Sequence, residues 1–171
     1  SSTSVEFEKY DDSLNALKEI SQSGLFPSNC RLLDSNEALF NGAGDGTKHL
    51  LILAFESADH DKSYSLDRAL ELADMNNGMY ERSPQTPEAH RSGSSGNWRN
   101  SFIRAPYLRE SFTRRGIIQD TFETSITWDR ASDFISEVKE LTSKEILKIT
   151  GKPSLVTCRI THSYPDGLAP Y

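Results

Sequence analysis

The segment SLVTCRITHS, residues 154–163, alternates between apolar and polar side chains through its centre. Cys158 and Ile160 are apolar, and they flank Arg159. Because successive side chains of a β-strand point to opposite faces of a sheet, the alternation predicts a strand with one buried face and one polar face. The polar positions are Thr157, Arg159 and Thr161, and the apolar positions are Val156, Cys158 and Ile160.

A second segment of this kind is TFETSITW, residues 121–128. Its apolar positions are Phe122, Ile126 and Trp128, and its polar positions are Thr121, Glu123, Ser125 and Thr127. The same period of two predicts another half-polar strand. We expect Glu123 to share a sheet face with the polar positions of the first segment, while Cys158 and Ile160 pack under helices.

Short strands and amphipathic helices alternate along the rest of the chain. We predict further strands at residues 4–8, 30–34, 49–55 and 79–81, helices at residues 11–23, 36–41, 63–76, 98–115 and 129–149, and a loop at residues 83–97. The strands are too short and too alternating for a parallel sheet buried on both faces. The sequence therefore predicts an α+β fold, a ferredoxin-like antiparallel sheet with helices on one face, in a single domain over residues 1–171.

The composition is that of a soluble globular protein, with 36% hydrophobic and 26% charged residues. The net charge is -6 and basic residues are interspersed with acids, so nucleic acid is not an expected partner. No stretch approaches the roughly 20 apolar residues of a membrane span. The N-terminus has neither a signal-peptide pattern nor an initiating Met, which is typical of an excised or processed piece of a longer protein.

Two features that often mark cofactor sites have simpler interpretations here. The Gly-rich NGAGDGT, residues 41–47, precedes a predicted strand, whereas a phosphate-binding loop lies between a strand and a helix N-terminus. We interpret it as a turn. Cys30 and Cys158 are too few for a zinc cage or a disulfide framework, so we expect small buried side chains and no metal site.

The chain shows no self-contained active site, because its four histidines are far apart in sequence and no nucleophile motif accompanies them. The arginines are more informative. Arg109 lies in the setting PYLRE, where its planar fork can grip a carboxylate or phosphate, and a surface salt bridge to Glu110 or Glu123 is the alternative. Arg159, on the polar strand face, needs water, an acid such as Glu123, or an anionic ligand.

Four segments together resemble a known family. They are CRLLD (30–34), NWRNSFIRAPYLRE (97–110), TFETSITWDR (121–130) and TCRITHSYPDGLAPY (157–171). Their order and spacing are similar to those of the alkyldihydroxyacetonephosphate synthase family, in the C-terminal cap region of flavoproteins of the vanillyl-alcohol-oxidase type. The pattern FETS-x-x-WDR followed by TCR-[IV]-T is the specific part of the resemblance.

The resemblance implies that this chain is the substrate-binding cap of a larger FAD-dependent enzyme. An N-terminal FAD-binding domain of the same protein is then the expected partner, with FAD bound only in the full-length protein and the isolated chain inactive. The implied reaction exchanges the acyl chain of acyl-dihydroxyacetone phosphate for a fatty alcohol in ether-lipid synthesis. A homodimer is possible in this family, and the expected location is the cytoplasm for a bacterial relative or an organelle in a eukaryote.

Two alternatives stay open at this point. The same cap serves FAD-dependent oxidases and dehydrogenases that act on hydroxy acids, so such an enzyme is the first alternative. The second is a non-enzymatic ferredoxin-like domain that binds a small molecule or another protein through its sheet face.

The resemblance also suggests which side chains meet an acidic, lipid-like substrate. Arg109 occupies the arginine position of a Y-[IL]-R-[DE] motif that binds the acidic part of the substrate in the family. The remaining candidates for substrate binding are Tyr107, Glu123, Arg159 and His162. Arg31 also occupies a family position, where its role can be structural support. His162 stands where the ether-lipid enzymes can carry a Gln.

Overall fold

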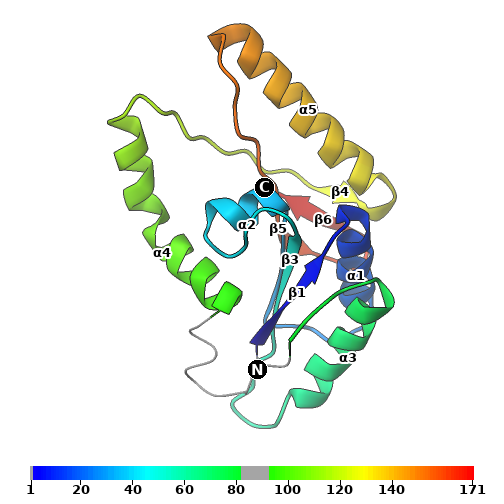
Figure 1. The fold of residues 1–171 in the computed structure, drawn as a ribbon. Coiled ribbons are helices and arrows are strands. Elements are labelled where there is room, and N and C mark those ends of the chain that lie inside the picture. Colours follow the sequence, from blue (N-terminus) through cyan, green and yellow to red (C-terminus); the bar gives the residue numbers. More distant parts are fainter. Residues whose placement is uncertain (1, 82–92) are drawn as a thin grey trace.

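The computed structural model describes residues 2–81 and 93–171. Within these residues one six-stranded sheet has the order β1-β3-β2-β5-β6-β4, and every neighbouring pair is antiparallel (Figure 1). The strands are β1 (Ser2–Phe7), β2 (Asn29–Leu33), β3 (His49–Ala54), β4 (Ile126–Thr127), β5 (Arg159–Ser163) and β6 (Gly167–Pro170). The predicted α+β class and antiparallel sheet are confirmed.

The first part of the chain forms the ferredoxin-like unit. β1, α1 (Tyr10–Gln22) and β2 are followed by β3 and α3 (Ser63–Met75), with the short helix α2 (Ser35–Phe40) between β2 and β3. After α3 the chain returns to the free edge of β1, where Met79 and Glu6 exchange two backbone hydrogen bonds of 2.8 Å. This β-α-β-β-α-β order is that of the ferredoxin-like motif.

The main hydrophobic core lies between this sheet and the helices α1 and α3. Leu51 and Leu53 of β3 point into it, and so do Leu17 of α1 and Leu70 of α3. Burying a side chain of this size stabilises the fold by about 1.5–3 kcal/mol. Cys158 and Ile160 lie in this core, as their alternation predicts.

A smaller core lies on the opposite face of the sheet. Leu50 and Ile52 alternate with the residues of the main core along β3, and they pack with Ala38 of α2. Helices therefore cover both faces: α1 and α3 lie on the expected face, whereas α2 lies on the other. The reason is that β3 reads HLLILA, so its side chains are apolar on both sides.

The strands β5, β6 and β4 extend the sheet beyond β2, and two of them are shorter than predicted. Of residues 154–163 only β5 is strand, because the N–H of Cys158 donates to the carboxylate of Asp34 at 2.9 Å and not to a neighbouring strand. Of residues 121–128 only β4 is strand, and Phe122 is 60% exposed. β6 was not predicted, since GLAP contains few residues that favour strands.

Two long helices, α4 and α5, contact the sheet over only part of their length. α4 (Gly93–Thr113) lies beside it, joined to the loop after α2 by a 2.5 Å hydrogen bond from Ser101 Oγ to the carbonyl oxygen of Asn41 (Figure 1). α5 (Ala131–Thr150) follows the single-turn helix η2 (Trp128–Arg130) and is anchored through Ala131 and Ile135.

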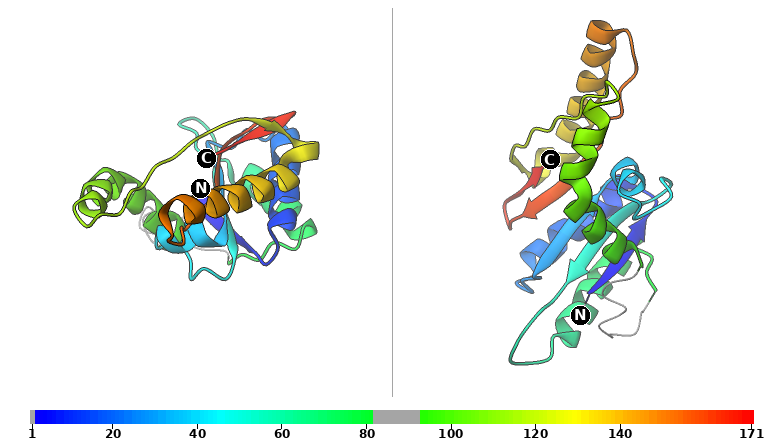
Figure 2. Two further views of the ribbon diagram at one scale, coloured as in Figure 1. Left: turned by 90° about the horizontal axis from the view of Figure 1, so that it is seen from above. Right: turned by 90° about the vertical axis from the view of Figure 1, so that its left-hand side faces the viewer.

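Beyond that anchor α5 runs past the sheet (Figures 1 and 2), and it ends at Gly151 in the left-handed conformation, with φ 68°. The predicted loop at residues 83–97 lies outside the described residues over 83–92, and α4 already begins at Gly93. Among the helices described, none combines the length and the apolar character needed to cross a membrane.

Candidate functional site

One face of the sheet around β2 and β5 carries polar side chains, and we call it the polar face. Its register follows from the pairing of Leu33 with Arg159, next to the pairing of Leu32 with Ile160 in the main core. Arg159 therefore points to the side of α2, together with Leu33 of the smaller core. The polar face is formed by Arg31, Glu37, Glu123, Thr157, Arg159 and Thr161.

The predicted grouping of polar residues on this face is confirmed. Glu37 of α2 accepts a 2.6 Å hydrogen bond from Thr157 Oγ1 and a 3.4 Å contact from Arg159 Nη1. Thr161 Oγ1 donates to Glu123 Oε1 at 2.6 Å. The acid that pairs with Arg159 is thus Glu37 and not Glu123, the partner that the sequence suggested.

Arg159 is the most enclosed cation of the polar face. Its side chain is 16% exposed and that of Glu37 is 8% exposed. The Cζ atom of Arg159 lies 3.9 Å from the centroid of the Tyr171 ring, which is within the range of a cation–π contact. Its Nε atom is buried and has no hydrogen-bond partner within the described part of the chain. A buried N–H donor without a partner is costly to the fold.

Arg31 of β2 lies near enough to Arg159 for the two charges to act on each other. The pKa of Arg31 is lowered, first by burial and then by the positive charge of Arg159. Two guanidinium groups on one half-buried face repel each other, and an anion between them would relieve that repulsion. The polar face thus brings two positive charges close together, beside the carboxylates of Glu37 and Glu123.

The buried carboxylate of Asp34 connects the elements that carry the polar face. Asp34 is 3% exposed, and it caps α2 by accepting a 2.7 Å hydrogen bond from the Glu37 N–H. Its other oxygen accepts from the N–H of Cys158 and from Lys139 Nζ of α5. Asp34 thus ties α2, α5 and the segment before β5 together, so Glu37 and Arg159 keep their relative position.

Asp34, Glu37 and Lys139 were not singled out from the sequence as site residues. The available signal was DSNE, residues 34–37, because an Asp followed three residues later by a Glu is typical of a helix N-terminus. That pattern predicts the cap. It does not predict that the second oxygen of Asp34 meets a lysine 105 residues later.

Cys158 is a small buried side chain, as expected, whereas Cys30 is partly buried against the main core. Burial raises the pKa of Cys30 to about 12 and that of Cys158 to about 11. The hydroxyl of Tyr10 donates to the sulfur of Cys158 at 3.9 Å. Because a thiolate is the nucleophilic form, neither thiol is set up for covalent catalysis at neutral pH.

Arg109 and Tyr107 lie on α4, apart from the group around Arg159 (Figure 1). Tyr107 is 73% exposed. The side chain of Arg109 is 67% exposed, and its Nη2 lies 3.9 Å from Asp120 Oδ1. The expected alternative partners are engaged elsewhere, because Glu110 pairs with Arg114 and Glu123 accepts from Thr161.

His162 lies on β5 but is exposed, unlike its neighbour Ile160. Its ring stacks on that of Tyr164, with the centroids 6.4 Å apart and the planes inclined by 28°. A register shift between β5 and β6 falls between Ile160 and His162. This bulge interrupts the strict alternation on which the sequence prediction rests.

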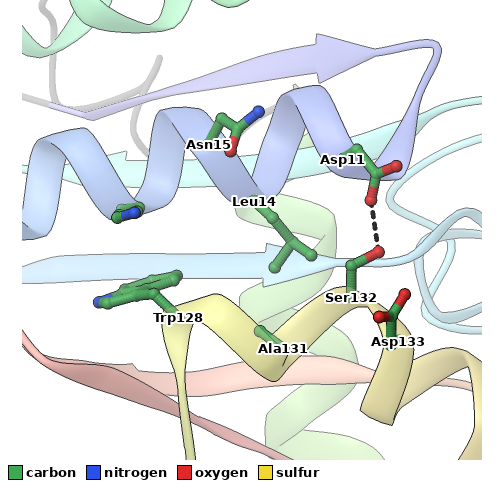
Figure 3. A pocket seen from close by; sticks show the side chains of 8 residues that line it. Asp11, Leu14, Asn15, Trp128, Ala131, Ser132 and Asp133 are labelled. Carbon is green, nitrogen blue, oxygen red and sulfur yellow. Dashed lines mark hydrogen bonds between the residues drawn. The ribbon is translucent and has the colours of Figure 1, made fainter.

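A hollow of about 390 Å³ lies between α1 and the start of α5 (Figure 3). The ring of Trp128 forms one end, Leu14 and Ala131 lie between the helices, and Asp11 accepts a 2.5 Å hydrogen bond from Ser132 Oγ. None of the predicted site residues lines it. Across residues 2–81 and 93–171 no group of three His, Cys, Asp or Glu side chains is placed to hold a metal ion.

Comparison with known proteins decides the family. The model of the family "FAD linked oxidases, C-terminal domain" matches residues 1–171. The chain belongs to this family.

Individual relatives agree with this membership. The alkyldihydroxyacetonephosphate synthase of Caenorhabditis elegans is 37% identical over 67 residues, which is 38% of this chain and 11% of that protein. Two solved structures of alkyldihydroxyacetonephosphate synthase, in space groups P1 and P212121, each superpose with a TM-score of 0.78 at 17% identity. They cover 99% of this chain, which spans only 34% of theirs.

In this FAD linked oxidase C-terminal domain the Gly-rich segment does not form a phosphate site. Residues 41–47 run from the end of α2 to β3, so they do not open a helix. Asp45 Oδ1 accepts from the N–H and the hydroxyl of Thr47, which closes a local turn. The interpretation as a turn is confirmed.

Proposed function

We propose that this domain is the substrate-binding cap of an FAD-dependent enzyme similar to alkyldihydroxyacetonephosphate synthase. Membership of the family supports the flavoenzyme class. The similarity to alkyldihydroxyacetonephosphate synthase over 67 residues supports the choice within that class. The proposed reaction exchanges the acyl chain of acyl-dihydroxyacetone phosphate for a fatty alcohol, without net oxidation or reduction.

The observation that carries the proposal is the nearness of two guanidinium groups, those of Arg159 and Arg31, on the polar face. A phosphate can accept from both guanidinium groups with charge-assisted hydrogen bonds. Glu37 pairs with Arg159, and Asp34 caps the helix that carries Glu37. The polar face therefore supplies binding and orientation for the acidic end of the substrate.

FAD, when bound, supplies the redox-active ring, and we place its binding in another part of the complete protein. We propose an N-terminal FAD-binding domain as the partner of this cap, with a homodimer as the assembly, in the cytoplasm or an organelle. The isolated cap is then expected to be inactive and to bind no FAD. Purified domain that retains flavin absorbance after incubation with FAD and desalting would contradict this.

Arg109 is proposed as a second anchor for the acidic group, with Tyr107 beside it and His162 and Glu123 lining the substrate side. The exposure of Arg109 on α4 leaves its guanidinium available to a partner. Its motif supports the role, because PYLRE matches the family setting.

The same anion site serves a second reaction class. An FAD-dependent oxidase or dehydrogenase of hydroxy acids would present a carboxylate to Arg159, so the polar face supports it as the alternative. A non-enzymatic binding domain is a third hypothesis, and a full-length protein that binds no FAD would favour it.

The experiment uses the full-length protein loaded with FAD. Formation of the ether product from acyl-dihydroxyacetone phosphate and a fatty alcohol supports the proposed reaction. Reduction of the flavin by a panel of hydroxy acids, without ether formation, would favour the alternative. Arg159→Gln should lose activity in either case, whereas Arg68→Gln, on the surface of α3, serves as the matched control.

A further inference from the structure

The short helix α2 begins with hydrogen bonds to two side chains that lie on different segments. Asp34, the residue before α2, accepts from the N–H of Glu37 at 2.7 Å. Ser35, the first residue of α2, donates its N–H to Nδ1 of His49 at 3.1 Å. His49 is the first residue of β3, 14 positions further along the chain. The start of α2 is therefore capped by a carboxylate and by an imidazole.

The imidazole can accept this bond in only one protonation state. A neutral histidine carries a proton on one ring nitrogen, whereas an imidazolium ion carries a proton on both. An N–H that donates to Nδ1 thus requires a neutral ring with its proton on Nε2. Protonation of His49 puts a second donor opposite the N–H of Ser35, so this hydrogen bond is lost.

The charges nearest to His49 have opposite effects on its proton. Burial is the main cause that lowers the pKa of His49 below its ordinary value of 6.5. The carboxylate of Asp34 acts to raise this pKa, and the ammonium group of Lys139, on α5, acts to lower it. A protonated His49 is therefore attracted to Asp34, the carboxylate that caps the same helix. Protonation thus disturbs both side-chain caps of α2.

The ionisable groups on the other neighbouring elements do not replace the lost acceptor. The ring centroid of Tyr10, on α1, lies 5.1 Å from that of His49, and burial raises the pKa of Tyr10, so this side chain is uncharged. Its hydroxyl donates to the sulfur of Cys158. Lys48, next to His49 in sequence, pairs with Glu6 of β1 at 3.4 Å. The cap of Ser35 is thus left to His49.

We propose that His49 is an acid-sensitive cap, which holds the first turn of α2 while its ring is neutral and releases that turn when the ring is protonated. Glu37 is the third residue of α2, so release of this turn moves its carboxylate away from Thr157 and Arg159. The polar face then has two arrangements, and pH selects between them. This device does not depend on the proposed reaction.

Hydrogen exchange of the full-length protein between pH 7.5 and 5.0, corrected for the intrinsic pH dependence of exchange, tests the cap. We expect the protection of the amides of residues 35–40 to fall about two- to thirty-fold as His49 is protonated, which is the effect of losing one helix cap. The fall should occur below pH 6.5, because the pKa of His49 is lowered from that value.

Two variants separate the cap from a general effect of acid. His49→Asn places an amide oxygen near the position of Nδ1, and this acceptor does not titrate, so protection should not change with pH. His60→Asn, at an exposed histidine, is the matched control and should keep the wild-type response. Where His49→Asn fails to fold, His49→Gln replaces it, since its amide does not titrate either.

The state of the ring is measured directly by 15N NMR of histidine-labelled full-length protein, in which the signal of His49 is the one that its variant lacks. At pH 7.5 we expect Nδ1 to be unprotonated, and the loss of protection in α2 should follow the titration of this ring. A proton on Nδ1 at pH 7.5 would overturn the acid-sensitive cap. So would constant protection of residues 35–40 through the titration, or an equal loss in the variant at His49.

Discussion

Thr161 donates a hydrogen bond from Oγ1 to Oε1 of Glu123 at 2.6 Å, across a separation of 38 residues. The N–H of Thr124 donates to the carbonyl oxygen of Pro170 at 3.2 Å, beside this bond. The two contacts hold residues 121–125 against β5 and β6, although this segment is not a strand. Residues 121–125 therefore form the edge of the polar face, and their position depends on β6.

Gly167 is the point at which that tether is most sensitive to substitution. A Cβ atom added here would lie 2.4 Å from the carbonyl oxygen of Ile126 in the neighbouring β4. Gly167→Ala should push β4 away from β6 and cost about 1–3 kcal/mol of unfolding free energy. Hydrogen exchange should show lost protection at Thr124 and Ile126. Asp166→Ala, at the exposed position just before Gly167, should change neither the unfolding free energy nor the hydrogen exchange. Equal behaviour of the two variants would refute the close approach of β6 to β4 at Gly167.

Asp34 should be the most sensitive polar residue of the domain. Asp34→Ala leaves the N–H groups of Glu37 and Cys158 without acceptors and Lys139 without its counter-ion. Breaking a buried network of this kind costs about 3–5 kcal/mol. Urea unfolding of the full-length protein, followed by a probe in this domain, measures the loss.

Two variants sharpen the interpretation of Asp34. Asp34→Asn keeps one oxygen acceptor but turns an amide donor toward other donors, so it should lose nearly as much stability. Asp59→Ala, at a carboxylate that is 90% exposed, should stay within about 0.5 kcal/mol of wild type. An Asp34→Ala protein as stable as Asp59→Ala would show that the network does not hold α2 and α5.

Local sequence patterns predicted most of the fold but only part of the candidate site. The period of two in TCRIT placed Arg159 and Ile160 on opposite faces, because one side of β5 packs on α1 and α3. The same reasoning left water, an acid such as Glu123 or an anionic ligand as alternatives for Arg159, and it did not name Glu37. Glu37 reaches it from a helix 122 residues away, and such a contact depends on tertiary packing, which no local pattern encodes.

The start of β5 and the whole of β6 were also not predicted correctly from the sequence. Residues 154–158 alternate like a strand, yet a side chain, Asp34, takes the hydrogen bond that a neighbouring strand would take. β6 contains Gly and Pro, which are depleted in strands, and it forms because β5 and β4 offer edges on both sides. Context overrides propensity in both cases.

The raised pKa values of the two thiols make the stability of the domain fall at alkaline pH. Burial raises the pKa of Cys30 to about 12 and that of Cys158 to about 11, from an ordinary value of 9.0. Above pH 9 the unfolded chain releases thiol protons that the folded chain keeps, so the free energy of unfolding falls as pH rises toward the folded values. Each thiol contributes a slope of up to about 1.4 kcal/mol per pH unit in this window.

Unfolding curves from pH 7 to 11 test this limit. Cys30→Ala should reduce the slope of the unfolding free energy above pH 9, while the contribution of Cys158 remains, and it should not alter the dependence below pH 9. Thiol reagents at pH 8 should modify Cys158 only after denaturation. Rapid native labelling of Cys158, which is 6% exposed, would contradict the burial.

Arg109 provides the sharpest test of whether α4 takes part in substrate binding. Its side chain is 67% exposed and its ion pair with Asp120 is long, at 3.9 Å, so the fold gains little from this pair. Arg109→Lys should therefore leave the melting temperature of the full-length protein unchanged.

A lysine keeps the charge but cannot form the bidentate contact that orients a phosphate or carboxylate. If that contact is desolvated in the complex, the change should lower kcat/KM by a factor equivalent to about 2–5 kcal/mol, in rate and affinity together. Arg114→Lys, directly after the end of α4 and with a side chain that is 76% exposed, is the matched control. Near-normal kinetics of Arg109→Lys would transfer the anchoring of the acidic group to Arg159 alone.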